Sequence, residues 1–276
     1  MTPRVCIIIP TYNRAHLVPR AIDSVIAQTV PDWELIVMNI GSTDNTTEVL
    51  AKYVDSRIRI LTIDHTSKTG APIMQARQMT SAPWVTFLCD DDEFLPERLE
   101  YHLREIERRP DIGATYCFGE IVHMDGSMSP HRSRHLGAEG NIFNLLLEEL
   151  FIPQTIICKP EYFVVSDDVE FSDWFAWLTL AYQTRIGCTP RILARFHESP
   201  GQRQRRWTLS EQFGHTHDLY EHVLKTFALE PEQHRRIRQL SFRARSDELW
   251  CHIPWPFRCP FAWPSRELAD LWARIS

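Results

Sequence analysis

The sequence predicts an α/β fold in which a mostly parallel β-sheet is flanked by helices. Within residues 1–110, short apolar runs alternate with segments whose apolar residues recur at helical spacing. Such alternation is typical of successive β–α units, which build a doubly wound parallel sheet. The first run, residues 5–9, reads Val-Cys-Ile-Ile-Ile, as expected for a strand that is buried on both faces.

The remaining elements follow in order along the chain. Further strands of the parallel sheet are predicted at residues 33–38, 58–63 and 84–88. Helices between them are indicated by apolar residues at helical spacing, such as Leu17, Ala21 and Val25. Beyond Pro110 we predict strands at 114–118, 120–124, 155–158 and 191–197, a polar loop at 129–140, and helices at 141–150 and 171–182. From Leu209 onward we predict helices at 209–229, 231–250 and 264–275.

Composition excludes several classes of protein. The net charge of −6 argues against a nucleic-acid binder. The cysteines form no CxxC pair, which argues against a disulfide framework and a zinc site and fits a reducing compartment. We see no signal peptide and no apolar run approaching the length of a membrane span. We therefore expect a cytoplasmic protein.

Consecutive carboxylates follow the strand predicted at residues 84–88. Asp90, Asp91 and Asp92 repel one another unless a cation or several donors compensate their charges. Ligands of open α/β sheets bind beyond the carboxyl ends of the strands, and Mg²⁺ or Mn²⁺ suits such oxygen ligands. The alternative is an acidic start of the next helix, near Pro96.

Five segments, in this order, resemble the family 2 glycosyltransferases of the GT-A fold, which use nucleotide sugars. They are residues 9–14, 41–46, Gly70 with Ala76 and Arg77, 88–97, and 171–178. The resemblance covers about residues 4–200 and implies a Rossmann-like GT-A domain over residues 1–207. Within it, 1–110 would be the nucleotide-binding half and 111–207 the acceptor-side half, with a helical C-terminal extension at 208–276.

The resemblance implies transfer of a sugar, with inversion, from a nucleotide diphosphate sugar to an acceptor. UDP-sugar is the default donor, and the acceptor would be a glycan, a lipid-linked molecule, a peptide or a small molecule. Mn²⁺ or Mg²⁺ would neutralise the leaving diphosphate. Asp173, at the head of an aromatic-rich helix, would be the general base. The alternative is that Asp173 only caps that helix.

The resemblance also implies residues for the donor and for the metal ion. The donor-binding residues would be Pro10, Thr11, Tyr12, Asn13, Arg14, Asn39, Gly41, Ser42, Arg77, Asp90 and Asp91. The metal ligands would be Asp91, Asp92 and His197. Alternatives stay open: Ser42 as a helix cap, Arg77 as a solvated helix residue and His197 as a structural residue.

The sequence departs from the family pattern in the donor pocket. Asn39 and Ile40 stand where the family has an Asp pair, and Asn39 can both accept and donate a hydrogen bond to a nucleobase. Cys89 stands at the first position of Asp-x-Asp, although a one-residue shift would let Asp90 and Asp92 serve instead. These changes leave open a catalytically silent nucleotide-sugar-binding or scaffold protein of the same fold.

The C-terminal part lies outside most of the resemblance. We predict that the basic segment 201–207 is a lid loop, with a solvated basic loop as the alternative. The helices beyond it carry several Trp residues, including Trp250 and Trp272. They are candidates for a homo-oligomer contact, an acceptor platform or local core.

Overall fold

The computed structural model describes residues 2–66, 70–149, 155–169, 172–199 and 208–251. Contacts divide the chain into two compact units. The first unit contains Met1–Asp167 and Ser172–Ser199, and the second contains Asp168–Phe171 and Pro200–Ser276. The predicted domain boundary and the predicted lid at 201–207 lie outside the described residues and stay predictions.

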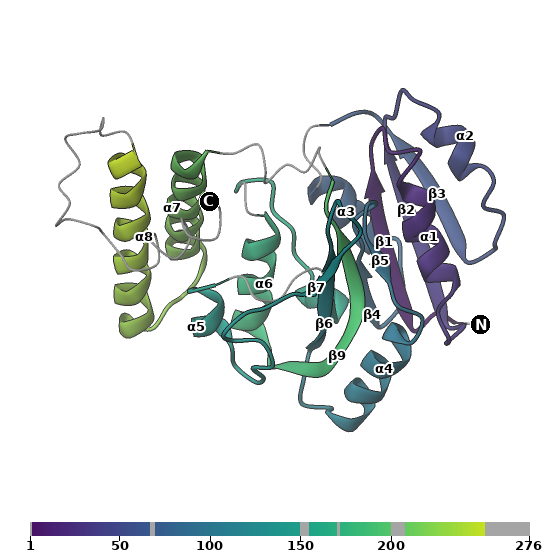
Figure 1. Cartoon of the computed structure of the whole chain (residues 1–276). Helices are drawn as coiled ribbons and strands as arrows, with labels where there is room; N and C mark the ends of the chain where they lie inside the picture. Colours follow the sequence, from purple (N-terminus) through teal and green to yellow (C-terminus); the bar gives the residue numbers. More distant parts are fainter. Residues whose placement is uncertain (1, 67–69, 150–154, 170–171, 200–207, 252–276) are drawn as a thin grey trace. The chain divides into compact units, whose positions relative to one another are not determined.

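Among the described residues, a sheet forms the centre of the first unit (Figure 1). It has nine strands in the order β3-β2-β1-β4-β8-β6-β9-β5, with β7 beside β6. Its parallel part consists of β1 (Val5–Thr11), β2 (Trp33–Ile40), β3 (Ile58–Ile63) and β4 (Trp84–Phe87). These are the strands predicted from the apolar runs. The α/β fold class with a mostly parallel sheet is confirmed for this part of the chain.

The strand β1 lies inside the parallel part and is covered on both faces. Val5, Ile7 and Ile9 are fully buried in one cluster with α1 (Val18–Ile26). Because successive side chains of a strand point to opposite faces, Cys6 and Ile8 face the other side, and α3 (Gly70–Gln78) contacts β1 and β2. Burial on both faces explains why the run contains no charged residue.

The rest of the sheet differs from the prediction in several strands. β6 (Ala114–Val122) is one strand where two were predicted, and β7 (Met128–Pro130) overlaps the start of the loop predicted at 129–140. Two very short strands complete the sheet, β5 (Glu93–Phe94) and β8 (Ile157–Cys158). β9 (Ile186–His197) starts five residues before the predicted start at 191. Its register jumps between the pairs Cys117–Thr189 and Phe118–Ile192, so the bulge absorbs Pro190, which lacks a backbone N–H.

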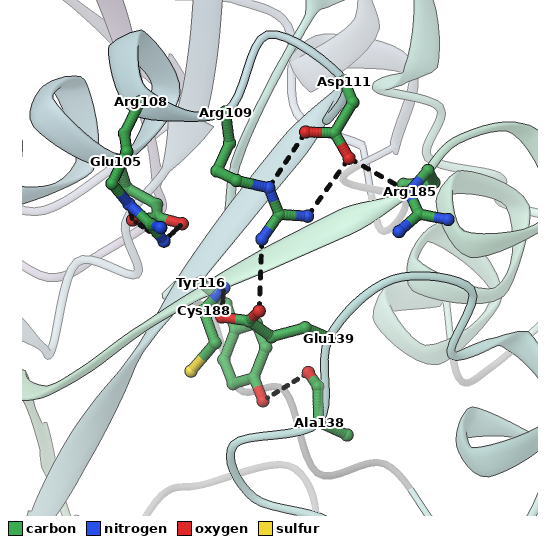
Figure 2. Close-up of polar contacts among 9 residues, drawn as sticks. All are labelled: Glu105, Arg108, Arg109, Asp111, Tyr116, Ala138, Glu139, Arg185 and Cys188. Carbon is green, nitrogen blue, oxygen red and sulfur yellow. Dashed lines mark hydrogen bonds and ion pairs between the residues drawn. The ribbon is translucent and has the colours of Figure 1, made fainter.

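The remaining helices of the first unit are α2 (Thr46–Leu50), α4 (Arg98–Arg108), α5 (Phe143–Leu146) and α6 (Ser172–Gln183), with a 3₁₀ turn, η1 (Pro160–Tyr162). Figure 2 shows polar contacts at the end of α4. Arg109 donates to Asp111 at 2.9 Å and to Glu139 at 3.2 Å, and Arg185 donates to Asp111 at 3.1 Å. The hydrogen bond from Arg109 lowers the pKa of Asp111 to about 2. These contacts fasten three chain segments together, although their exposure limits the free energy that they contribute.

The second unit contains two described helices, α7 (Leu209–Thr226) and α8 (Pro231–Cys251), which pack against each other. Thr208 and Glu211 form a capping box at the start of α7, the reciprocal arrangement that satisfies free N–H groups of a first turn. The predicted ends of both helices lie within three residues of the observed ends. The helix predicted at 264–275 lies outside the described residues. Among the described helices, none combines the length and apolar character that crossing a membrane requires.

Candidate active site

The loops after β1, β2 and β4 leave the sheet at the same edge. The register pairs Thr11 of β1 with Asn39 of β2, and the Leu88 N–H donates to Ile8 O at 3.0 Å just after β4 ends. Since the carboxyl ends of parallel strands meet at one edge, residues 12–14, 41–44 and 89–92 emerge side by side. This is the edge where the sequence predicted a ligand site.

Residues 89–92 form a turn, called the acidic turn below. The Asp92 N–H donates to Cys89 O at 3.2 Å and closes it. One possible ligand atom from each of Cys89, Asp91 and Asp92 lies within 4.8 Å of the others. Asp92 is only 6% exposed. The acidic turn thus offers carboxylate oxygens and a sulfur to one cation, so its donor set fits a divalent metal ion.

Burial and mutual repulsion change the acidity of these carboxyl groups. Burial raises the pKa of Asp90 to about 6, an effect partly offset by the Thr11 hydroxyl and the charge of Arg14. Burial, with the charge of Asp91 added to it, raises the pKa of Asp92 to about 8. Burial is the larger cause of both shifts, since it disfavours the charged form of a carboxyl group. A bound cation would compensate these negative charges.

Two arginines approach Asp91 from the loop after β1 and from α1. Arg14 Nη1 lies 3.3 Å from Asp91 Oδ2, and Arg20 Nη2 donates to the backbone oxygen of Asp91. The side chain of Arg14 remains 29% exposed. Arg14 therefore carries a positive charge to the rim of the acidic turn, where the leaving diphosphate of a nucleotide sugar is expected.

His197 ends β9 beside the acidic turn. Its backbone N–H donates to Asp92 Oδ1 at 2.9 Å, and its ring Nε2 lies 3.1 Å from Glu93 Oε1. Among the described residues, the group of candidate metal ligands contains Cys89 rather than His197. The structure thus brings His197 to the site through its backbone, while its role as a metal ligand stays a prediction. Cys89, which the sequence indicated only as a departure from Asp-x-Asp, is thus a candidate ligand.

Asn13 joins the loop after β1 to the loop after β2. Its N–H donates to Ser42 Oγ at 3.0 Å, and its Oδ1 accepts from the Thr43 N–H at 2.7 Å. Asn39 is fully buried; its Oδ1 accepts from the Ser42 N–H at 3.2 Å and its Nδ2 donates to Thr47 at 3.0 Å. The Asn39 amide therefore fixes the segment that follows β2. The predicted contact of Asn39 with a nucleobase stays a prediction.

Tyr12 lies at the same edge and keeps 40% of its surface exposed. Its ring stacks on His65, with ring centroids 4.3 Å apart. Gly41 adopts a positive φ of 65°, and an added Cβ there would lie 2.5 Å from the backbone nitrogen of His65. The segment after β3 therefore packs closely on the loop after β2. The sequence did not predict this contact.

Arg77 lies in the last turn of α3, and Asp173 lies in the first turn of α6. Arg77 Nε donates to the Pro160 carbonyl oxygen, so its predicted contact with the donor stays a prediction. Asp173 Oδ1 accepts from the Trp174 N–H at 2.8 Å, within the first turn of α6. Trp177 stacks on Phe87 with centroids 5.8 Å apart. Because positions four apart share one helix face, this contact places the Asp173 face of α6 toward the carboxyl end of β4.

Comparison with known proteins identifies the family. The model described as "Glycosyl transferase family 2" matches residues 6–166, more than half of the chain. The chain belongs to glycosyl transferase family 2. The matched span contains the loops after β1 and β2, Arg77 and the acidic turn, and it ends before α6.

Relatives of this family 2 chain include named bacterial proteins. The glucosyltransferase WfgD of Escherichia coli, named as acting from UDP-Glc on α-D-GlcNAc-diphosphoundecaprenol, is 34% identical over 119 residues, 43% of this chain and 47% of WfgD. CgeD of Bacillus subtilis is 32% identical over 133 residues, 45% of this chain and 31% of CgeD. The chain thus spans about a third to a half of the length of these relatives.

Solved structures share the fold of the chain. TarS of S. aureus, residues 1–349 in complex with UDP-GlcNAc, superposes with a TM-score of 0.73 at 14% identity and covers 92% of this chain and 77% of that chain. The mannosyltransferase PcManGT from Pyrobaculum calidifontis, in complex with GDP-Man and Mn²⁺, superposes with a TM-score of 0.64 at 17% identity. The match covers 100% of this chain and 81% of PcManGT. The predicted GT-A fold is confirmed.

Proposed function

We propose that this family 2 protein transfers a sugar from a nucleotide diphosphate sugar to an acceptor, with inversion at the anomeric carbon. The observation that carries the proposal is the acidic turn, which offers partly buried carboxylates at the edge where β1 and β2 end. The relative WfgD is named for a UDP-sugar donor, and the structural neighbours hold UDP-GlcNAc or GDP-Man with Mn²⁺. UDP-sugar is the default donor.

Asp91 and Asp92 would hold Mn²⁺ or Mg²⁺, with His197 as a further ligand. Such an ion acts as a Lewis acid that neutralises a leaving diphosphate. Arg14, already beside Asp91, adds a fixed positive charge on the same rim. Asp90 would lie closer to the nucleotide, next to Thr11.

The nucleotide would lie over the loops after β1 and β2. Tyr12 presents an exposed ring to a nucleobase, and the bonds among Asn13, Ser42 and Thr43 fix the shape of both loops before the donor arrives. Such preorganisation reduces the entropy lost on binding. Pro10, Asn39, Gly41 and Arg77 complete the proposed donor-binding set by position.

Asp173 would take the proton from the acceptor hydroxyl as that hydroxyl attacks the sugar. The packing of Trp177 on Phe87 supports this role, because it brings the face of α6 that carries Asp173 toward the strand of the acidic turn. We propose residues 1–110 as the nucleotide-binding half and 111–207 as the acceptor-side half. The extension 208–276 would serve a homo-oligomer contact or the acceptor, and the protein would act in the cytoplasm.

A second candidate is a catalytically silent protein that binds nucleotide sugars. It is favoured by Asn39, whose buried amide is committed to Ser42 and Thr47 where the family has an acidic residue. A silent protein would bind nucleotide but neither hydrolyse nor transfer the sugar.

Asp173→Asn tests the proposed mechanism. The amide cannot accept the proton, so the transfer rate should fall at least about 100-fold, the usual contribution of a general base. Metal-dependent nucleotide binding should remain. Transfer is measured by release of the nucleoside diphosphate with Mn²⁺ present, in a screen of sugar acceptors, and nucleotide binding by calorimetry.

The matched control is Asp125→Asn, the same change in the exposed turn between β6 and β7; it should transfer at the wild-type rate. Transfer by Asp173→Asn at the wild-type rate would remove Asp173 as the base. Nucleotide binding by the wild type without any turnover would instead favour the silent protein.

A further inference from the structure

The acidic turn places a sulfur among its carboxylates. The hydrogen bond from the Asp92 N–H to Cys89 O brings the two ends of the turn together, and ligand atoms of Cys89, Asp91 and Asp92 all lie within 4.8 Å of one another. Around one ion, a sulfur at about 2.3 Å and an oxygen at about 2.1 Å lie at most about 4.4 Å apart. Only two ligands of one ion can lie opposite each other, so side-chain rotations that bring the three ligand atoms to about 3–4 Å from one another would let one cation touch all three.

Cys89 also differs from most of the described cysteines in its surroundings. Cys6, Cys117, Cys158 and Cys188 are buried in the sheet, whereas Cys89 and Cys251 are partly exposed. An ion entering from solvent can reach Cys89 beside Asp91, whose side chain is 13% exposed. Cys89 follows Leu88, whose N–H bond to Ile8 O of β1 fixes the backbone just before Cys89.

We propose that Cys89 is a thiolate ligand of the cation held by Asp91 and Asp92, and that it selects Co²⁺, Zn²⁺ or Mn²⁺ over Mg²⁺. The inference rests on the proposed function, since it adds a ligand and a metal preference to the same site. Mg²⁺ demands oxygen ligands in near-ideal octahedral geometry, so a sulfur in one position weakens its binding. Transition-metal ions, Co²⁺ and Zn²⁺ above all, accept mixed oxygen and sulfur ligands.

Co²⁺ titration of the full chain tests the assignment. A cobalt–thiolate bond gives a charge-transfer absorption in the near ultraviolet that a site made of oxygen ligands lacks. The wild type and the control Cys251→Ser should show this band, and Cys89→Ser should lose it while keeping its circular dichroism. Cys89→Asp should restore an all-oxygen site and shift the ratio of Mg²⁺ to Co²⁺ affinities toward Mg²⁺ by about tenfold or more.

The outcomes separate this inference from the proposed function. Co²⁺ binding, measured by equilibrium dialysis, with no thiolate band in the wild type would overturn the role of Cys89 and leave the carboxylate site intact. A band that persists in Cys89→Ser would overturn it too. Sugar transfer in excess chelator by a protein that binds no Co²⁺ would overturn the metal site and this inference together. A thiolate band in a protein that transfers no sugar would support the ligand and contradict only the proposed activity.

Discussion

Asn13 is held in a backbone conformation that few residues other than glycine adopt. Its φ is 52°, and its Oδ1 accepts from the N–H groups of Thr43 and Asp44 at 2.7 and 3.3 Å. Asparagine tolerates the left-handed region better than most residues because its short amide can bond nearby backbone. The Asn13 side chain thus helps to fasten the loop after β1 to the loop after β2.

Replacement of Asn13 by alanine or by glycine separates the two effects. Asn13→Ala should lower the free energy of unfolding by about 2 kcal/mol, because a left-handed alanine costs about 1 kcal/mol or more and the hydrogen bonds are worth about 1 kcal/mol net. Asn13→Gly removes the same bonds but fits the same φ, so it should cost less. Urea denaturation of both variants gives the values. Equal losses would mean that the backbone conformation at Asn13 is not costly.

The sequence predicted that Asp90, Asp91 and Asp92 follow a buried strand at this edge of the sheet, but not what they contact there. Asp90, Asp91 and Asp92 could be predicted as site residues because consecutive charged residues after an apolar strand are recognisable in the linear sequence. The partners of Asn39 and the grouping of Cys89 with Asp91 and Asp92 depend on how loops fold back. A four-residue turn closed by one backbone hydrogen bond leaves little trace in composition.

The strands were predictable in proportion to their length and burial. β1 to β4 are apolar and lie side by side in a parallel ladder, so each was visible from its own residues. β5 has two residues and pairs with β9, about a hundred positions away. β7 pairs with β6 but has only three residues and is mostly exposed. Such short strands form because an adjacent strand offers backbone N–H and C=O groups for pairing. The residues of the short strand itself do not predict this pairing.

Gly41 controls how the loop after β2 meets the segment after β3. Gly41→Ala adds a Cβ that would lie 2.5 Å from the His65 backbone, at a φ of +65°. The loop must shift, so we expect a destabilisation of about 3 kcal/mol or more, from overpacking plus the left-handed cost. The shift should also disturb the stacking of Tyr12 on His65 and weaken UDP binding.

Gly126→Ala is the matched control for Gly41→Ala. Its φ of +83° is also left-handed, but an added Cβ meets nothing within 4 Å. It should therefore cost only about 1–2 kcal/mol and leave UDP binding unchanged. Thermal unfolding and calorimetric titration with UDP measure both variants. Similar losses of stability and of UDP affinity in Gly41→Ala and Gly126→Ala would show that the contact with His65 does not contribute to the effect.

The chain consists of a first unit, which contains the candidate site residues, and a second unit, whose described part is helical. The candidate residues lie in the first unit, and the family match at residues 6–166 falls within it. The second unit contributes the helical pair α7 and α8. The resemblance of motifs in order was enough to predict the family and the GT-A fold. Three of those motifs, residues 9–14, 41–46 and 88–97, lie at the carboxyl ends of β1, β2 and β4, where ligands of open α/β sheets bind.

Metal-dependent nucleotide binding connects the fold, the acidic turn and the proposed activity. Calorimetric titration of UDP into the wild type should show binding that requires Mn²⁺. Asp91→Ala should weaken that binding by about 100-fold, an effect on the scale expected for changes in a metal site. Asp125→Ala, in the exposed turn before β7, should bind as the wild type does. Unchanged Mn²⁺-dependent affinity in Asp91→Ala, or a wild type that binds none of UDP, GDP and dTDP with Mn²⁺ present, would contradict the account.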